Sequence, residues 1–424
     1  MKYKIIFLLA LIINFFSCSP SEDSSESEID EPDTNSEFYV EPCDDFVEFD
    51  TYNDDFLLFL RSKGYDLNSD GKISCAEAQE IIDLDLGDTR FRNLKGIESF
   101  SNLKSIIGVL EGELNLYNNS NLEEVNFDYF KPSGNTVPVI NKLILPADSK
   151  LKILNSPEII IREVINIKSQ TNLEQVYLYS ITNNKIDLSN SKELNDLHIN
   201  GQSLAEVLIG DNLELKKISI SGSIDNIDLT GVPNIIDLTL IGDLTILDLS
   251  QNLKLKNINI TNDLPQLDLS KNLELKDVQL NNNLLRTIDL STNNKIEKLE
   301  IEDNDLETII LPESALLKDL NLRNNHLESI NISSVTKVVN VDLSNNKLES
   351  LNLIENSNLY SLDVSSNELS FLSLKNGTNI SRPLLKMDAT SNNLDCIEID
   401  ENFNPSNYSG WSKDPSTSYS SICQ

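Results

Sequence analysis

The chain has 424 residues, with 68 acidic residues against 34 basic ones and a formal net charge of −34. A chain this acidic repels nucleic acid and anionic lipid, which argues against a partner bound through its phosphate backbone. The length would allow two or three ordinary domains, but a fixed internal period over much of the sequence favours one elongated array.

The first 17 residues have the pattern of a secretory signal peptide. Lys2 and Lys4 precede an apolar run that is too short to span a bilayer. The Ser17-Cys18 junction after this run resembles a bacterial lipoprotein processing site, although Phe15 and Phe16 depart from the usual residues. The resemblance implies a lipid on Cys18. The alternative is ordinary signal cleavage nearby, which would leave Cys18 free.

Residues 18–42 are predicted to form an acidic disordered tether. Residues 19–37 contain eight acidic residues and neither Lys nor Arg, so they cannot bury a core. Glu22 and Asp23 follow Cys18 closely and resemble the surface-export signal of Bacteroidota lipoproteins. This resemblance implies an outer membrane lipoprotein that is exposed on the cell surface.

A calcium-binding module is predicted at residues 43–81. Residues 52–63 read as a short amphipathic helix that Gly64 ends. The stretch DLNSDGKISCAE at 66–77 then matches the twelve-residue calcium loop of the EF-hand, and Gly71 permits its sharp turn. The predicted ligands are Asp66, Asn68, Asp70, the backbone carbonyl of Lys72, Ser74 through water, and Glu77.

A single loop of this kind outside the cell is expected to act as a structural clip rather than as a sensor. Extracellular modules bind calcium with dissociation constants of about 10⁻⁴–10⁻³ M, so ambient calcium would largely fill the loop. The alternative is a loop that never holds metal. Cys43 and Cys75 could pair in an oxidising compartment and fix the clip, but the sequence does not determine their connectivity.

Apolar residues recur from residue 82 to residue 395 in the spacing of stacked coils. After a first repeat at 82–106, the segment 107–170 is irregular, with strands expected around Val125, Leu143 and Ile165. From 173 to 395 the pattern is regular. Its leading strand residues are Val176, Leu197, Ile218, Leu238, Ile258, Val278, Leu299, Leu320, Val341, Leu362 and, after an insertion, Met387. One copy cannot bury both of its short strands, whereas stacked copies can.

An asparagine occupies one equivalent place in each of the later coils. Stacked Asn side chains can satisfy backbone groups of neighbouring turns that no strand ladder reaches. The members are Asn283, Asn304, Asn325, Asn346, Asn367 and Asn392. In the earlier coils we assign the same place to Gln202, Ser223, Asp243 and Asp263, which are polar but poorer ladder formers.

The pattern L-x-x-L-x-L-x-x-N-x-L resembles the bacterial leucine-rich repeat family, including internalin-like proteins. A calcium loop followed by such repeats also resembles surface lipoproteins of Bacteroidota. The resemblance implies a right-handed leucine-rich repeat solenoid, with a parallel β-sheet on the concave side and short extended segments on the other. At ~4.8 Å per strand, the eleven regular strands would span about 50 Å.

Residues 396–424 are expected to cap the last coil, which would otherwise expose its core. Cys396 and Cys423 bracket this segment, and a disulfide between them would close a loop worth roughly 3 kcal/mol in the chain-entropy model. The cap contains Trp411, the only tryptophan. We expect this side chain in the core of the cap rather than as a platform for a sugar.

The sequence does not predict an enzyme. The two histidines, His198 and His326, lie six coils apart, and no catalytic motif is present. Calcium-dependent polysaccharide lyases with β-helix folds are the first alternative, but their chemistry needs a basic residue beside clustered carboxylates. Lys217, Lys298 and Arg323 lie on well-separated coils. A purely structural envelope protein is the second alternative.

A binding function is the main prediction. Most outward residues of the leading strands are small and polar, whereas Tyr177, Tyr179 and His198 form a candidate ligand patch. The alternative to a ligand patch is that the two tyrosines are present only because tyrosine favours β-strands. The expected partner is a protein or a glycan, bound for adhesion, host interaction or nutrient capture. Calcium would act structurally, the membrane would be contacted only through the lipid anchor, and no nucleic acid would bind.

Overall fold

The computed structural model describes residues 38–40, 43–51, 54–127, 137–147, 149–314, 316–377 and 384–423. The predicted signal peptide, Cys18 and the tether as far as residue 37 lie outside these ranges. None of the described helices combines the length and the apolarity that crossing a bilayer requires.

Two short helices precede the solenoid, α1 (Asp55–Ser62) and α2 (Cys75–Gln79). Helix α1 buries Phe56 and Leu60, and the chain turns at Gly64, whose φ of 84° favours glycine. The ring of Phe56 packs edge-on against Phe91 of the first coil, with ring centroids 5.8 Å apart. The apolar face predicted for this helix therefore packs directly on the solenoid.

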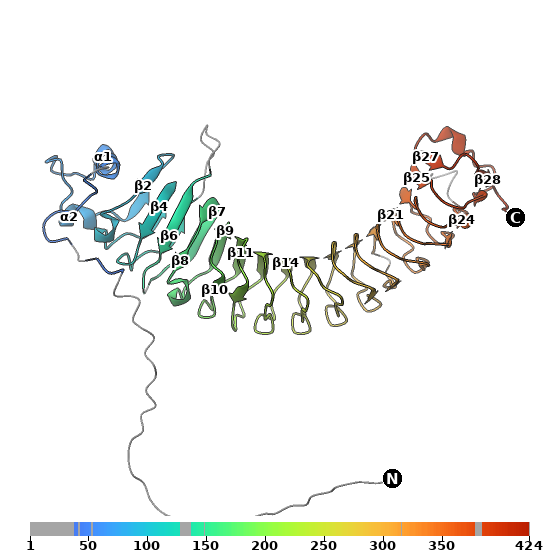
Figure 1. The fold of residues 1–424 in the computed structure, drawn as a ribbon, viewed down its shortest axis with the longest axis horizontal. Helices are drawn as coiled ribbons and strands as arrows, with labels where there is room; N and C mark the ends of the chain where they lie inside the picture. The colour runs from blue at the N-terminus through green and yellow to red at the C-terminus, as the bar shows by residue number, and fades with distance from the viewer. Residues whose placement is uncertain are drawn as a thin grey trace, which may run out of the picture. The chain divides into compact units, whose positions relative to one another are not determined.

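Most of the described chain is a stack of coils that share one parallel sheet (Figure 1). Within the described residues this sheet has 20 strands, and it lies on the concave side of the solenoid, as predicted. Its main row is β1 (Asp83–Asp85), β3 (Ser105–Ile107), β5 (Glu124–Asn126), β7 (Ile153–Ile161), β9 (Gln175–Tyr179), β11 (Asp196–Gly201), β13 (Lys217–Gly222), β14 (Asp237–Ile241), β15 (Asn257–Thr261), β16 (Asp277–Gln279), β18 (Lys298–Glu300), β20 (Asp319–Asn321), β21 (Asn340–Asp342), β23 (Ser361–Asp363), β25 (Lys386–Ala389) and β27 (Trp411–Lys413).

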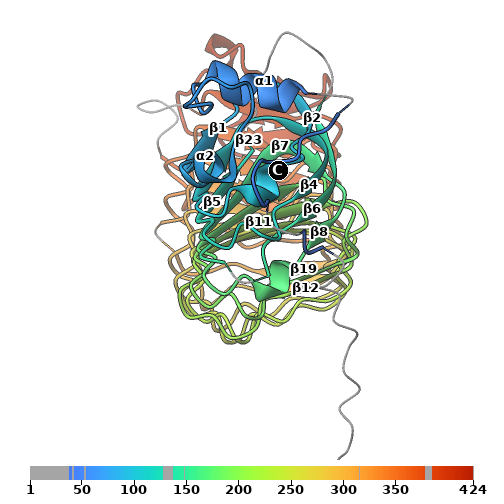
Figure 2. The ribbon, with the colours of Figure 1, turned by 90° about the vertical axis from the view of Figure 1, so that its left-hand side faces the viewer.

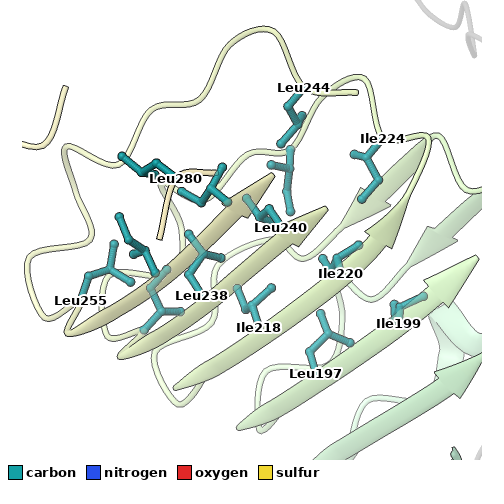
Figure 3. Close-up of a cluster of buried hydrophobic side chains, with 14 of the residues drawn as sticks. Leu197, Ile199, Ile218, Ile220, Ile224, Leu238, Leu240, Leu244, Leu255 and Leu280 are labelled. Atoms are coloured by element: carbon teal, nitrogen blue, oxygen red, sulfur yellow. The ribbon is translucent and has the colours of Figure 1, made fainter. Parts of the chain in front are cut away.

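The register of this row confirms the predicted leading residues. Val176 lies opposite Leu197, and the alignment continues coil by coil to Met387. Each side chain in the column points inward and is almost fully buried, as Figure 3 shows for Leu197, Ile218 and Leu238. Viewed along the stack, with α1 and α2 in front, the later coils lie behind one another (Figure 2).

The irregular segment contains a second row of strands beside the first. This row is β2 (Phe91–Asn93), β4 (Leu110–Asn115), β6 (Val139–Ile144) and β8 (Val164–Ile165). The strands expected around Val125, Leu143 and Ile165 are present, but the nine-residue strand β7 was not predicted. Pro157 interrupts its pattern, and the register with β9 shifts between Ser156 and Ile160, a place where a strand tolerates proline.

The opposite side of the coils is built from short extended segments, as predicted. In the described ranges they form three separate ladders, and three 3-10 turns lie between strands: η1 (Ile97–Ser99), η2 (Ile167–Ser169) and η3 (Pro405–Asn407). The ladders are β10 (Lys185–Asp187) with β12 (Glu206–Leu208), β17 (Thr287–Asp289) with β19 (Thr308–Ile310), and β22 (Ser350–Asn352) with β24 (Phe371–Ser373), β26 (Cys396–Glu398) and β28 (Ser418–Ser420).

The predicted asparagine ladder is present from Asn283 to Asn392. Asn325 is typical: its Nδ2 donates to the carbonyl of Ile301 at 2.8 Å, and its Oδ1 accepts from the Leu306 amide at 3.0 Å. In the coil of Asp263 the assignment was wrong by one residue. Asn262 bonds as a ladder member and not Asp263, because its Nδ2 donates to the carbonyl of Leu240.

A second asparagine ladder was not predicted. Asn252, Asn272 and Asn293 are fully buried, and each Nδ2 donates to two carbonyls of the preceding coil. The sequence feature that could have revealed this ladder is an Asn two residues after each Leu-Ser pair, as in residues 249–252. These amides satisfy carbonyl groups where the chain turns between the two faces.

The C-terminal segment forms one further coil. Strand β27 continues the concave sheet, with Trp411 opposite Met387, and β28 continues the last ladder. Trp411 packs against Phe403 and Tyr419, and its Nε1 donates to the Leu384 carbonyl at 2.7 Å. The Cys396–Cys423 disulfide closes this coil. Trp411 therefore lies in the core of the cap.

Candidate functional site

The predicted calcium loop is a compact turn between α1 and α2. Asp66 accepts hydrogen bonds from the amides of Asp70 and Gly71, at 3.1 and 2.9 Å, and Asn68 Oδ1 accepts from Asp70 at 2.8 Å. Gly71 has a φ of 87°, the sharp turn that its place in the loop requires. The side-chain oxygens predicted as calcium ligands at the start of the loop therefore accept hydrogen bonds from backbone amides of the same turn.

Glu77 closes the loop from the other side. It is 6% exposed, and it accepts hydrogen bonds from the Leu67 amide and from Ser74. Hydrogen bonds from the Ser74 backbone and hydroxyl, and from the backbone of Asn68 and Leu67, lower the pKa of Glu77 despite its burial. The side chain is therefore a carboxylate at neutral pH, as a metal ligand must be.

The predicted ligand atoms of the loop are of the type that calcium binds, but the carboxylates do not converge on one central point. Among the described residues, no three acidic, histidine or cysteine side chains lie close enough together to hold a metal ion. Within the loop, the carboxylate oxygens of Glu77 instead accept hydrogen bonds from backbone amides of the loop. Asp66, Asn68, Asp70, the Lys72 carbonyl, Ser74 and Glu77 supply hard oxygen atoms, which calcium prefers.

The loop is fixed to the preceding chain at its exit. The Val47 amide donates to the Ile73 carbonyl at 2.9 Å, and the Cys75 amide donates to Asp45 at 3.1 Å. The Cys43–Cys75 disulfide adds a covalent link at the same place. Contacts with the solenoid begin earlier, at 38–40, since the Asn115 side chain donates to the Phe38 carbonyl.

The structure brings together Tyr177 and His198 on neighbouring strands of the concave sheet. Their rings are stacked, with centroids 4.3 Å apart and planes inclined by 8°. The Tyr177 hydroxyl donates to Asp196 Oδ2 at 2.9 Å, and His198 Nε2 lies 2.7 Å from Asp196 Oδ1. Asp196 thus positions both rings.

The tyrosine hydroxyl in this cluster stays protonated. Partial burial, the hydrogen bond to Asp196 and the charge of Asp196 together raise the pKa of Tyr177 to about 12. Tyr179 lies two residues further along β9 on the same face and is 42% exposed. The sequence identified the three aromatic residues of this patch, but it did not identify Asp196 as their partner.

The rings of Tyr177 and His198 belong to a row of uncharged outward residues, which we name the neutral band. It comprises the second and third outward residues of β9, β11, β13, β14 and β15: Tyr177, Tyr179, His198, Asn200, Ser219, Ser221, Thr239, Ile241, Asn259 and Thr261. None of them is Asp, Glu, Lys or Arg. The first outward positions of the same strands include Asp196, Lys217 and Asp237, which border the band. Charged residues return in later coils at Glu300, Asp342, Asp363 and Asp388.

A groove of about 570 Å³ runs beside the neutral band, over the ends of its strands. Gly201, Gly222 and Gly242 form part of its wall. A Cβ at Gly222 or Gly242 would lie 2.4 or 2.3 Å from a carbonyl oxygen of the preceding coil. Glycine therefore lets the coils approach closely here, and main chain lines the groove.

The opposite face has a groove of about 510 Å³, which is lined in part by Asp248, Asp268 and Asp289. Each of these carboxylates accepts a hydrogen bond from the amide of the serine two residues later. These bonds lower the pKa of each aspartate and join each carboxylate to the backbone of a local turn.

The basic residues considered for catalysis are not placed as bases. Lys298 Nζ lies 3.0 Å from Glu300 Oε2. Partial burial opposes its charge, but Glu300, Asp277 and Asp319 outweigh this effect and raise the pKa of Lys298. A lysine held in its protonated form cannot accept a proton from a substrate. Lys217 and Arg323 are exposed on other coils.

Comparison with known proteins identifies the fold. No protein-family model and no curated protein matches the sequence. Among solved structures, the functional domain of InlJ from Listeria monocytogenes is similar, with a TM-score of 0.61 and 20% identity over 77% of this chain and 71% of that one. A leucine-rich repeat protein of Leptospira interrogans is similar too, with a TM-score of 0.55 and 17% identity over 80% of this chain and 93% of that one.

An internalin from Listeria monocytogenes, inlF, gives a TM-score of 0.50 and 16% identity over 79% of this chain and 94% of that one. At these identities the likeness establishes the fold alone. The chain is a leucine-rich repeat solenoid of the kind seen in bacterial internalin-like proteins.

Proposed function

We propose that this protein is a non-enzymatic binding protein of the cell surface, whose concave sheet recognises a protein or glycan partner. Adhesion, host interaction and nutrient capture are the roles that such binding would serve. The observation that supports this proposal is the stacked Tyr177–His198 pair, held by Asp196 at one end of the neutral band. Aromatic residues on a concave polar surface are favoured anchors for a partner.

Replacing the two tyrosines should remove the anchor. Partners found on a host-protein array and a glycan array should bind the Tyr177→Ala, Tyr179→Ala double variant at least about tenfold more weakly, a loss of ~1.4 kcal/mol. Tyr360→Ala is the matched control, since Tyr360 is 48% exposed on a distant coil. Equal affinities for the double variant and the parent would exclude the patch as the binding site.

We also propose that calcium stabilises the N-terminal module. A ligand present at 10–100 times its dissociation constant stabilises the folded state by about 1.4–2.7 kcal/mol. About 10 mM calcium should therefore raise the melting temperature of the parent, given the affinity of extracellular loops. Asp66→Ala should abolish the rise, while Asp88→Ala, an exposed residue outside the loop, should retain it. No response in the parent would mean that the loop does not bind calcium.

The surface location is a further part of the proposal, and it rests on the sequence around Cys18. An outer membrane lipoprotein would incorporate labelled palmitate in growing cells, and Cys18→Ala should abolish the incorporation. Labelling that persists in this variant would place the lipid elsewhere. Cleavage of the protein by a protease added to intact cells would support its exposure on the outside.

The lyase alternative lacks a supporting feature in the described residues. The Lys298 side chain is engaged by Glu300, and its raised pKa opposes the role of a base. The envelope-protein alternative would leave the neutral band without a ligand. Incubation with acidic polysaccharides distinguishes these possibilities, because new unsaturated products would require an enzyme.

A further inference from the structure

We propose that the neutral band binds an uncharged glycan chain, laid across strands β9 to β15 and into the adjoining groove. This inference rests on the proposed binding function and specifies the ligand class. At ~4.8 Å per strand, five strands span about 19 Å, so the ligand would be an oligosaccharide segment rather than a single sugar.

The first argument is the unused hydrogen-bonding capacity of the band. The side chains of Asn200, Ser219, Ser221, Thr239, Asn259 and Thr261 are half-buried, and none of them has a hydrogen-bond partner within the described part of the chain. These groups can donate and accept hydrogen bonds, as the hydroxyl groups of a sugar can.

The later coils of the same sheet show the contrast. Asp342 accepts hydrogen bonds from the Ser344 amide and hydroxyl, at 2.9 and 2.6 Å, and Asp363 does the same with Ser365. Polar side chains there satisfy one another, whereas those of the neutral band do not. Six such unused groups therefore lie together on the neighbouring strands β11, β13, β14 and β15.

The second argument is charge. In a chain of net charge −34, the ten positions of the band contain no Asp, Glu, Lys or Arg, and the charged residues that border them on the same strands, Asp196, Lys217 and Asp237, are of both signs. Such a surface suits an uncharged ligand. Asp243 and Asp263 line the groove and would repel an anionic polysaccharide. A cationic ligand would instead favour the later coils with Asp342, Asp363 and Asp388.

The third argument is the shape of the site. Tyr177 and His198 stack on each other at one end of the band, and Tyr179, on the same strand as Tyr177, has an exposed ring. The groove of about 570 Å³ is within the usual size of a small-ligand site. The buried centre of a protein–protein interface is more apolar than its rim. The only exposed aliphatic residue of the band is Ile241, at 42%, so we favour a glycan.

Calorimetric titration of the purified full chain tests the inference. The probes are the uncharged hexasaccharides of glucose, mannose and xylose, with hexagalacturonate as the acidic comparison. At least one uncharged probe should bind, and hexagalacturonate should not. Thr239→Glu, which places a carboxylate in the middle of the band, should weaken this binding at least 100-fold, and Asn259→Ala about tenfold.

The control is Ser361→Ala, an outward serine of β23 outside the band, which should bind within twofold of the parent. Circular dichroism would show that each variant remains folded. The glycan inference is overturned if no uncharged probe binds at millimolar concentration, or if Thr239→Glu binds as the parent does. In that event, a partner found on the arrays whose binding is weakened by the tyrosine replacements would still support the proposed function. If no such partner were found, both the glycan inference and the proposed function would be overturned.

Discussion

Replacement of Asn325 by alanine should lower the free energy of unfolding by about 3–5 kcal/mol. The Asn325 side chain is 5% exposed, and its Nδ2 donates to the carbonyls of Ile301, Leu322 and Arg323. Its Oδ1 accepts from the Leu306 amide. Alanine would leave the Ile301 carbonyl and the Leu306 amide without their partner, and each unsatisfied buried group costs about 1–3 kcal/mol. The other two carbonyls keep a second donor, Asn346 Nδ2 for Leu322 and the Asp303 amide for Arg323.

Urea denaturation and hydrogen exchange together measure this effect. Coils of a solenoid contact mainly their neighbours, so exchange should quicken most at the Leu306 amide and in the adjoining coils. His326→Ala is the control, because His326 lies next in the chain but its side chain is 47% exposed and its Nδ1 is 3.8 Å from Asp305. A change within about 0.5 kcal/mol is expected for this variant. A similar small change for Asn325→Ala would refute the structural role of the ladder.

Removal of the Cys396–Cys423 disulfide should destabilise the last coil by roughly 3 kcal/mol. The bond joins residues that are 27 positions apart and closes the coil that contains β27 and β28. Without this bond, the chain-entropy model gives the unfolded segment more conformations, and β27 and β28 are paired on only one side. The Cys396→Ser, Cys423→Ser double variant should therefore lose hydrogen-exchange protection first at residues 396–423.

The second disulfide supplies a matched control. Cys43 and Cys75 are 32 positions apart, so their loop-closure entropy is similar. The Cys43→Ser, Cys75→Ser double variant should lose protection around the calcium loop and keep it at the C-terminal coil. Equal protection of residues 396–423 in the parent and in the Cys396→Ser, Cys423→Ser variant would show that packing around Trp411 holds this coil.

The regular part of the fold could be predicted because one interaction dominates there. Each leading residue from Val176 to Met387 must be buried in the same column, so the 20–21 residue spacing determines both the strand and its register. The ladder of Asn283 to Asn392 follows for the same reason. A buried polar group that repeats with the apolar period must bond to neighbouring coils.

The irregular segment could not be predicted to the same extent. Strand β7 contains Pro157, and its partner residues in β5 and β9 are 29 and 22 positions away. Because the spacing changes from coil to coil, no period identifies the pairing. The single-residue error at Asp263 has a similar cause, since this coil reaches the ladder position one residue sooner, at Asn262.

The sequence by itself determined the repeat, the inward Leu and Ile residues and the aromatic residues of the candidate patch, because each has a local pattern. The calcium ligands at residues 66–77 remain a prediction from such a pattern. Only the tertiary structure decided what lies beside them. Asp196 joins Tyr177 and His198 through the register of two strands, and the neutral band extends over five coils. Contacts between coils depend on the number of residues in each coil. The outward polar residues do not repeat with a fixed period, so the sequence alone does not reveal which of them lie together.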